Sequence, residues 1–289
     1  MISVIIPTYN RASVIHESIN SVLRQTYKKF ELIIVDDGST DNTKAVAGQY
    51  NDERIRYIYN DSSVHGPSKA RNIGIDAAIG EYISFNDSDD ELSEDKLEKQ
   101  LSFMRETGAD VIFCSMHKQD GYIPAENFYE SDCTLENVLK GSFTGTPAYF
   151  GKAECFRQEH FDENLKCNED WELMIRLLDK FDVRFQPDSL VEVAVSENSV
   201  GSDVNKALIA IDYILDKHSV LYKRYPLSQK RLQFGRKYIV ALSKDLEAQK
   251  KISEGSRMNL PDQLNALYRR AIRYSYSTRM LIADKVNRS

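Results

Sequence analysis

The first 115 residues of this chain alternate short apolar runs with segments of helical periodicity. Runs that predict β-strands cover residues 3–6, 31–35, 54–59, 82–85 and 110–114, and helical patterns cover residues 11–25, 68–79 and 93–106. Such alternation is typical of βαβ units, in which helices cover a mainly parallel sheet. Gly80 follows one of the helical patterns and is expected to end that helix as its C-cap. The chain is therefore predicted to have an α/β fold.

The pattern changes beyond residue 115. Residues 115–165 are less regular, and residues 168–180 have the apolar stripe of an amphipathic helix. Two further strands are expected at 183–185 and 190–195, and the pattern is helical from residue 206 to the end, with breaks at Pro226 and Pro261.

Charge divides the chain more sharply than its periodicity does. Residues 1–203 carry 20 Lys and Arg against 37 Asp and Glu, whereas residues 204–289 carry 18 against 7. Such asymmetry indicates separate modules. We therefore expect an acidic α/β domain at 1–203 and a basic α-helical C-terminal extension at 204–289.

Composition excludes several classes of protein. Of the 289 residues, 42% are hydrophobic and 28% are charged, as in a packed globular protein. No apolar run approaches the roughly 20 residues that span a bilayer, and the N-terminus lacks the basic region and cleavage site of a signal peptide. The four scattered cysteines have no Cys-x-x-Cys spacing, so free thiols in a reducing cytoplasm are expected.

Three polar clusters lie where predicted strands end, at residues 7–10, 36–37 and 87–89. Ligands of open α/β sheets bind at the carboxyl ends of the strands, so these clusters are expected to line one site. Each also has a simpler interpretation, because acids favour turns after strands and the N-termini of helices. Asp87 and Asp89 would repel each other, and a divalent cation that also binds diphosphate oxygens would relieve the repulsion.

Several motifs, in this order, resemble glycosyltransferase family 2. They are Ser-Val-Ile-Ile-Pro-Thr-Tyr-Asn-Arg at 3–11, Phe-Glu-Leu-Ile-Ile-Val-Asp-Asp-Gly-Ser-Thr-Asp at 30–41, Ala-Arg-Asn-Ile-Gly at 70–74 and Asp-Ser-Asp-Asp at 87–90. The resemblance covers about residues 1–200. It implies the GT-A fold, which is a Rossmann-like, mainly parallel sheet flanked by helices, together with a nucleotide-sugar donor, a divalent cation and inversion at the anomeric carbon.

The resemblance also implies roles for residues on the nucleotide side. Pro7, Tyr9 and Arg11 would border the nucleotide, partly through backbone contacts. Asp37 would accept a hydrogen bond from the edge of the base, with Asp36 as the neighbouring candidate. A carboxylate suits a pyrimidine NH because it accepts without donating.

Further roles follow on the diphosphate side. Arg71, with Lys69 nearby, would face the diphosphate, where a cation offsets the charge that grows on the leaving group. Asp89 would ligate Mn²⁺ or Mg²⁺, and Asp87 would contact the ribose or a metal-bound water. Asn86 occupies a position that is commonly apolar in the family, which leaves the packing beneath this turn open.

The second chemical cluster is Glu169-Asp170-Trp171-Glu172. In similar proteins an Asp here is the general base for the acceptor hydroxyl, and such help is worth about 10²–10⁴ in rate. We expect Asp170 in this role, with Glu169 as second candidate. The alternative is that Asn168 caps a helix with acids in its first turn. Trp171 is expected in the core rather than under an acceptor sugar.

The expected reaction is transfer of one sugar from a nucleoside-diphosphate sugar, with UDP favoured, to a hydroxyl of a glycan, glycolipid or glycoprotein. One alternative is a non-catalytic protein that binds nucleotide sugars on the same scaffold. Another is a sugar nucleotidyltransferase, which needs a Gly-rich basic loop that residues 7–10 do not supply. A dinucleotide fingerprint and a P-loop are both absent, and no nucleic-acid partner is expected.

Basic pairs and aromatic residues are interleaved through the extension, from Lys223-Arg224 to Arg269-Arg270 and Arg273. One hypothesis is a peripheral face at the inner surface of the membrane, which would approach a lipid-linked acceptor. The alternative is a helical lid or a homo-oligomer interface with solvated charge.

Overall fold

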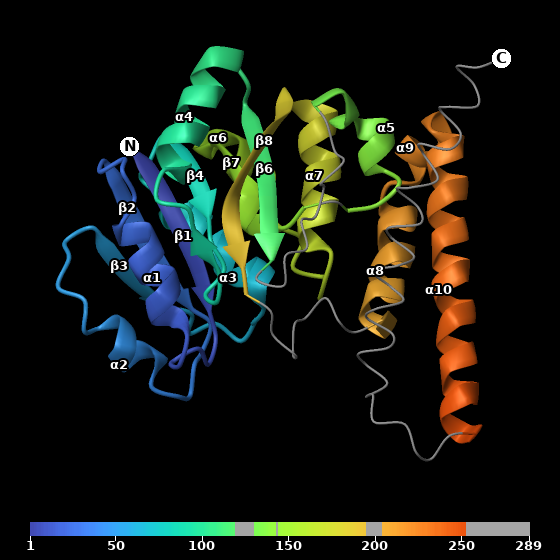
Figure 1. Ribbon diagram of the computed structural model, residues 1–289, viewed down its shortest axis with the longest axis horizontal. Coiled ribbons are helices and arrows are strands. Elements are labelled where there is room, and N and C mark those ends of the chain that lie inside the picture. The colour runs from blue at the N-terminus through green and yellow to red at the C-terminus, as the bar shows by residue number, and fades with distance from the viewer. Residues whose placement is uncertain (119–129, 143, 195–203, 253–289) are drawn as a thin grey trace. The chain divides into compact units, whose positions relative to one another are not determined.

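A computed structural model describes residues 1–118, 130–142, 144–194 and 204–252 (Figure 1). Two compact units divide the chain, Met1–Ser196 and Glu197–Ser289. The division lies a few residues before the boundary that the charge distribution suggests.

The first unit combines one sheet with helices that flank it (Figure 1). Its elements in chain order are β1 (Ile2–Thr8), α1 (Ile15–Leu23), β2 (Phe30–Asp36), α2 (Thr43–Ala47), β3 (Ile55–Tyr59), α3 (Pro67–Ala77), β4 (Tyr82–Phe85), β5 (Glu91–Leu92), α4 (Lys96–Thr107), β6 (Val111–Lys118), the 3₁₀ turn η1 (Glu130–Asp132), α5 (Leu135–Val138), the 3₁₀ turn η2 (Thr146–Ala148), β7 (Tyr149–Lys152), α6 (Ala153–Gln158), α7 (Glu169–Lys180) and β8 (Val183–Val193).

The strands of the sheet follow the order β3-β2-β1-β4-β7-β6-β8-β5. β1 pairs in parallel with β2 and β4, and β2 pairs in parallel with β3. β7 is antiparallel to both β4 and β6, while β6 and β8 are parallel. The predicted α/β fold is thus confirmed as a mixed sheet whose first half, β3 to β4, is parallel.

β1 and β2 lie inside the sheet, and every residue of both strands is buried. Their continuous apolar sequences suit strands that are covered on both faces. On α1, Ile15, Ile19 and Val22 follow helical spacing and are buried. β1, β2 and α1 form near the predicted positions because their apolar residues are the ones that the fold buries.

Two local predictions are wrong. Gly80 does not cap α3, whose C-cap is Ala78. It instead allows close approach, since a Cβ at Gly80 would lie 2.6 Å from the backbone nitrogen of Ser3. The two strands expected at 183–185 and 190–195 are one strand, β8, which continues through the exposed residues between them.

The second unit contains α8 (Val204–Lys217), α9 (Ser219–Arg224) and α10 (Pro226–Ile252). The predicted break at Pro226 is confirmed as the start of α10. Arg236 of α10 pairs with Asp212 of α8, which ties the two helices together. No helix among the described residues is long and apolar enough to cross a membrane. Pro261, Arg269-Arg270 and Arg273 lie outside the described residues.

Candidate active site

The carboxyl ends of β1, β2 and β4 meet at one edge of the sheet. The backbone NH of Asp37, just past β2, donates to the carbonyl of Thr8 at the end of β1 (2.8 Å). The NH of Asn86, just past β4, donates to the carbonyl of Ile5 (3.0 Å). The three polar clusters of the sequence therefore begin on neighbouring parallel strands, as the strand-end rule requires.

Asp36 and Asp37 are both buried and surrounded by donors. Asp36 accepts from the backbone NH of Ser39 (2.7 Å) and from the hydroxyl of Tyr57. Burial and the Asp36 carboxylate raise the pKa of Tyr57, which keeps that hydroxyl a donor.

The carboxylate of Asp37 holds the loop that follows β3. Its two oxygens accept from Asn60 Nδ2 and from the backbone NH of Gly66, each at 2.6 Å. The His65 ring lies beside it, with Nδ1 3.1 Å from the carbonyl oxygen of Asp37. Gly66 is the last residue before α3, so Asp37 sets where that helix begins. A carboxylate oxygen can accept more than one hydrogen bond, so Asp37 keeps acceptor capacity for a base.

The segment after β1 carries the other candidates for the nucleotide side. Pro7 is buried within β1, opposite Val35 of β2, whereas the Tyr9 side chain is 55% exposed. The backbone NH of Arg11 donates to Thr43 Oγ1 (2.9 Å), and its guanidinium lies 3.8 Å from an Asp89 oxygen. Arg11 thus connects the loop after β1 to the acidic turn.

The acidic turn after β4 is fixed from below by Asn86, which is fully buried. Its Nδ2 donates to Ser18 Oγ (2.8 Å) and to the carbonyl of Asp90 (3.0 Å). Ser18 Oγ in turn donates to the carbonyl of Asp87 (2.9 Å). The Nδ2 group of this polar residue is thus satisfied by α1 and by the turn itself, whereas its Oδ1 is buried without a hydrogen-bond partner.

These contacts leave the side chains of Asp87 and Asp89 about one-third exposed, at 32% and 30%. Burial and repulsion from Asp87 raise the pKa of Asp89, and Arg11 opposes the shift. The two carboxylates therefore stand partly exposed at the edge of the site, each beside one arginine.

Arg71 joins this turn to the second acidic cluster. Its side chain is buried, with 5% of the residue exposed, and its Nη atoms donate to Asp87 (2.7 Å) and to Glu169 (2.8 Å). Burial opposes the charge, but the two carboxylates raise the pKa of Arg71 above its ordinary value. Its Nε is buried without a hydrogen-bond partner. The role of Arg71 beside the diphosphate, which the family resemblance implies, stays a prediction; in the structure both its Nη groups bind carboxylates.

Asp170 lies in the first turn of α7. The alternative interpretation, a cap by the Asn168 side chain, is not observed: Asn168 adopts a left-handed conformation (φ 58°) and its side chain makes no capping hydrogen bond. One Asp170 oxygen accepts from the backbone NH of Trp171 (2.7 Å). Burial and the neighbouring Glu169 raise the pKa of Asp170 to about 7, against the pull of Arg71. A carboxyl with this pKa exchanges its proton near neutral pH, as a general base must.

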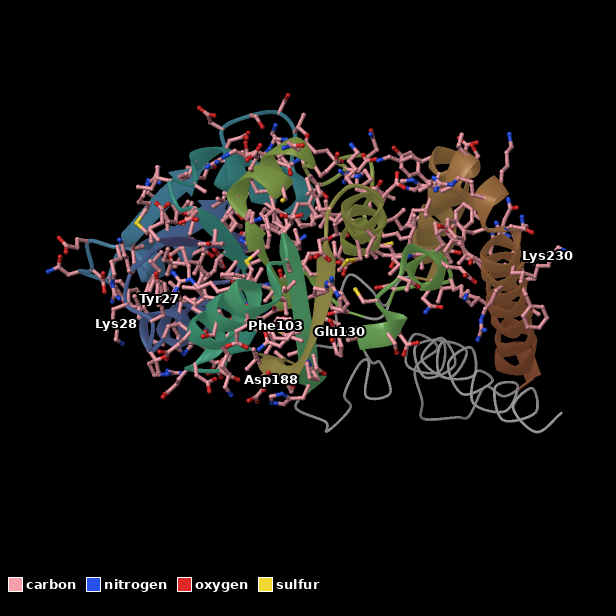
Figure 2. All side chains as sticks on the ribbon, turned by 90° about the horizontal axis from the view of Figure 1, so that it is seen from above. Tyr27, Lys28, Phe103, Glu130, Asp188 and Lys230 are labelled. Atoms are coloured by element: carbon pink, nitrogen blue, oxygen red, sulfur yellow. The ribbon has the colours of Figure 1, made fainter. Side chains whose placement is uncertain are left out.

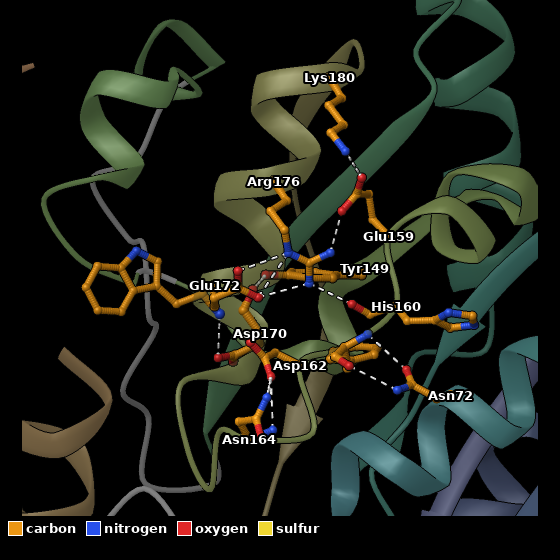
Figure 3. Close-up of polar contacts among 12 residues, drawn as sticks. Asn72, Tyr149, Glu159, His160, Asp162, Asn164, Asp170, Glu172, Arg176 and Lys180 are labelled. Carbon is orange, nitrogen blue, oxygen red and sulfur yellow. Dashed lines mark hydrogen bonds and ion pairs between the residues drawn. The ribbon is translucent and has the colours of Figure 1, made fainter. Parts of the chain in front are cut away.

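The start of α7 is held in place by the network in Figure 3. Arg176 binds Glu172 of its own helix, Glu159 (2.5 Å) and the carbonyl of His160 (2.6 Å). Asn72 of α3 donates to the carbonyl of Phe161 and accepts from its NH, both at 2.9 Å. The segment before Asp170 is therefore anchored at two points.

The fold brings together most of the residues that the sequence singles out. Asp87, Arg71, Glu169 and Asp170 form one connected group, and Asp37 reaches it through the start of α3. Lys69 does not join, because it pairs with Glu163 (3.5 Å). Trp171 is buried and donates its indole NH to the carbonyl of Val138 (2.7 Å), so the prediction of a core position is confirmed.

Sequence reasoning missed Ser18, Tyr57, Asn60 and Arg176. Asn60 directly follows β3, so the strand-end rule could have found it. The other three lie inside a helix or strand, and their partners are distant in sequence.

Asp87 and Asp89 suit a divalent ion that is also bound by a diphosphate. Among the described residues, no group of three or more His, Cys, Asp or Glu could hold a metal by itself. Mg²⁺ and similar ions typically use one or two carboxylates together with substrate phosphates. The raised pKa of Asp89 reflects charge that such an ion would neutralise.

The chain is similar in sequence to several known proteins. The family model for glycosyl transferase family 2 matches residues 3–162. A glycosyltransferase of Rickettsia conorii, RC0461, is 38% identical over 68% of this chain, but the chain spans only 33% of that protein. TuaG of Bacillus subtilis, named as a teichuronic acid biosynthesis glycosyltransferase, is 36% identical over 72% of this chain and 84% of its own length.

Two further similarities concern substrates. A Campylobacter jejuni protein named as a GalNAc(5)-diNAcBac-PP-undecaprenol beta-1,3-glucosyltransferase is 31% identical over 58% of this chain and 57% of its own length. The structure of S. aureus TarS (residues 1–349) in complex with UDP-GlcNAc superposes with a TM-score of 0.64 and 26% identity, covering 74% of this chain and 66% of TarS. The observed fold is thus similar to that of a protein that binds UDP-GlcNAc.

Proposed function

Because the chain belongs to glycosyltransferase family 2, we propose that it transfers one sugar from a nucleoside-diphosphate sugar to an acceptor hydroxyl, with inversion. The observation that carries the proposal is the bridge formed by Arg71. It links Asp87, on the side of the donor, to Glu169, beside the candidate base. In the proposal, the groups for the leaving diphosphate and for the incoming hydroxyl belong to one site.

In the proposed reaction, the acceptor oxygen attacks the anomeric carbon while the bond from that carbon to the diphosphate oxygen breaks. Asp170 takes the proton of the acceptor hydroxyl, and the electron pair of the broken bond leaves with the diphosphate. The raised pKa of Asp170 supports this role, because a stronger base accepts the proton more readily. Glu169 is held by Arg71 and is the weaker candidate.

Arg71 acts in this proposal as a positioning residue. Its guanidinium group fixes the carboxylates of Asp87 and Glu169. Its positive charge also keeps the pKa of Asp170 lower than burial alone would make it. The charge also lies close to where the diphosphate would leave, which favours that departure.

The donor side is proposed to consist of Pro7, Tyr9, Arg11 and Asp37 around the nucleotide, with Asp36 fixing the turn. We favour a UDP-sugar, which agrees with the UDP-GlcNAc bound by TarS. Asp89 and Asp87 would hold Mn²⁺ or Mg²⁺, which would supply positive charge beside the diphosphate.

The acceptor is proposed to be a hydroxyl of a glycan, glycolipid or glycoprotein, and the lipid-linked class is favoured. Support comes from the undecaprenol-linked acceptor in the name of the C. jejuni relative and from the basic C-terminal helices. These helices form a separate extension in the proposal, and their task is peripheral attachment at the inner face of the membrane rather than homo-oligomer formation.

A donor screen tests the proposed function. The protein is incubated with UDP-, GDP- and dTDP-sugars, with Mn²⁺, with Mg²⁺ and with a chelator, and the released nucleotide is identified. Metal-dependent release of a nucleoside diphosphate is expected, and Asp89→Ala should abolish it while the protein stays folded. Full activity of Asp89→Ala would exclude the metal assignment.

The same screen separates two alternatives. Release of pyrophosphate would identify a nucleotidyltransferase. Donor binding without turnover for any acceptor would identify a non-catalytic binding protein.

A further inference from the structure

The exposed side of α10 combines apolar and basic residues in one line. Leu227 and Phe234 are 71% and 69% exposed, and Lys230 and Lys237 are also exposed. These four residues, called here the outer stripe, are spaced three, four and three positions apart, so they share one helix face. Figure 2 shows Lys230 projecting from α10 on the side away from α8 and α9.

The opposite side of α10 is the one that packs. Ser228, Leu232 and Ile239 are buried, and they follow the same helical spacing, about half a turn away from the outer stripe. Arg236 uses its charge within the unit, in its pair with Asp212. The outer stripe is therefore a second apolar surface that the fold of the described helices does not use.

We propose that the outer stripe docks the protein on an anionic membrane surface. Leu227 and Phe234 enter the boundary between headgroups and acyl chains, and Lys230 and Lys237 bind anionic headgroups. Interfacial helices combine apolar anchors with Lys or Arg in this way. This inference rests on the proposed lipid-linked acceptor and names the residues that would bring the enzyme to it.

Charge favours a lipid surface over the other occupants of this face. Residues 226–244 contain no acidic residue, so nothing in that stretch offsets the lysines. A second copy packed on the same face would set lysines against lysines. Residues 253–289 carry seven Lys and Arg against three Asp and Glu, so this segment would be repelled as well.

The acidic first unit of another copy would attract the lysines but offers less to the apolar anchors. Among the described residues of that unit, the large apolar residues that are exposed are Tyr9, Tyr59, Val64 and Ile79, and the first two carry polar hydroxyls. A bilayer interface supplies anionic headgroups and an apolar layer together.

Vesicle flotation of the full chain tests the proposal. Wild type is expected to bind mixed phosphatidylglycerol–phosphatidylcholine vesicles at low salt and to leave pure phosphatidylcholine vesicles unbound. Lys230→Glu/Lys237→Glu should lower the partition coefficient at least about tenfold, since each lysine near an anionic surface contributes to binding. Leu227→Ser/Phe234→Ser should also lower it, by removing the anchors.

Two control variants match these changes on the first unit. Lys28→Glu/Lys29→Glu alters the same number of exposed charges, and Ile79→Ser removes an apolar side chain with 69% exposure. Both should bind the vesicles as wild type does. Absence of wild-type binding, or equal binding by the outer-stripe variants, overturns the proposal.

Light scattering of the same proteins addresses the competing occupant. If wild type is an oligomer that the outer-stripe variants dissociate, the stripe is an interface between copies and the membrane proposal is wrong. Donor hydrolysis without vesicles should be unchanged in the outer-stripe variants. If the wild type binds vesicles but hydrolyses no donor, the proposed glycosyl transfer is wrong and the proposed docking surface is still supported.

Discussion

Two pairs of adjacent acids occupy this site, and their surroundings differ. Asp36 and Asp37, after β2, are met by donors: a hydroxyl, a side-chain amide and two backbone NH groups. Asp170, at the start of α7, receives one backbone NH and lies beside another carboxylate. The first pair is fixed as acceptors, whereas the second contains a carboxyl that can exchange a proton near neutral pH.

The difference shows that an acidic dipeptide has no fixed role. The donors that Asp37 meets belong to the loop after β3 and to the start of α3. The charge of Asp37 therefore maintains the shape of the site. Burial and the like charge of Glu169 disfavour the ionised form of Asp170. Its carboxylate therefore takes up a proton more readily, as a base must. Arg71 moderates the second pair by neutralising Glu169.

The largest expected effect is that of Asp170→Asn. The Asn Oδ1 still accepts from the NH of Trp171, so the fold should persist, but the side chain no longer accepts a proton. The rate constant for transfer should fall by about 10²–10⁴. Asp179→Asn, at an exposed acid farther along α7, is the control and should retain activity. Steady-state kinetics with the identified donor decide, and an unchanged kcat would remove Asp170 from catalysis.

Arg71→Met should have the next largest effect. It leaves Asp87 and Glu169 without their shared cation, and loss of one partner from a buried ion pair costs roughly 3–5 kcal/mol. Urea unfolding measures this loss. Arg11→Met removes a half-exposed arginine with a long ion pair to Asp89, so its cost should stay below about 1 kcal/mol. Equal costs for the two variants would contradict the bridging role of Arg71.

Asp37→Asn probes the donor-rich pair. One carboxylate oxygen becomes an NH₂ group that faces a donor, so the free energy of unfolding should fall by about 1–3 kcal/mol. The KM for the donor should rise while kcat stays within a few-fold. Asp61→Asn, on the same loop but exposed, is the control. A loss of kcat with an unchanged KM would mean that the two acid pairs are not distinct.

The pH profile gives the finest test of the comparison. Only ionised Asp170 accepts a proton, so kcat/KM should fall about tenfold per pH unit below about 7. The sign for stability is opposite: the folded chain holds this proton more tightly than the unfolded chain, so the contribution of Asp170 is lost as pH rises from about 4 to about 7.

Two variants sharpen the profile. Asp170→Asn should remove this part of the stability profile. Arg71→Met should move the activity limb to higher pH, because Arg71 lowers the pKa of Asp170. If kcat/KM of Arg71→Met falls at the same pH as that of the wild type, the arginine does not act on the base.

Local sequence pattern was enough for much of the fold. The alternation of apolar runs and helical segments predicts β1, β2, β4, α1 and α7 near their observed bounds, because these strands are buried on both faces and these helices have one apolar side. It failed at β8, where exposed residues interrupt the apolar run and pairing with the neighbouring strand β6 resumes after a register shift. It also failed at Gly80, because this position requires a glycine for close contact with the backbone of Ser3 rather than for a helix cap.

The motifs and the strand-end rule place Asp37, Asp87 and Asp89 at the carboxyl edge of the sheet, since parallel strands bring their ends together. They do not say which acid is surrounded by donors. The partners that decide this are far away along the chain: Asp37 meets Asn60 and Gly66, and Asp87 meets Arg71.

By itself, then, the sequence determined an α/β fold, the family and the acids at its strand ends, because periodicity and short motifs are local properties. Only the tertiary structure decided that Arg71 is held between Asp87 and Glu169, that Asn86 supports the acidic turn through Ser18, and that Asp170 has a raised pKa. Burial and electrostatic coupling depend on groups brought together across the sheet, and no spacing along the chain encodes them.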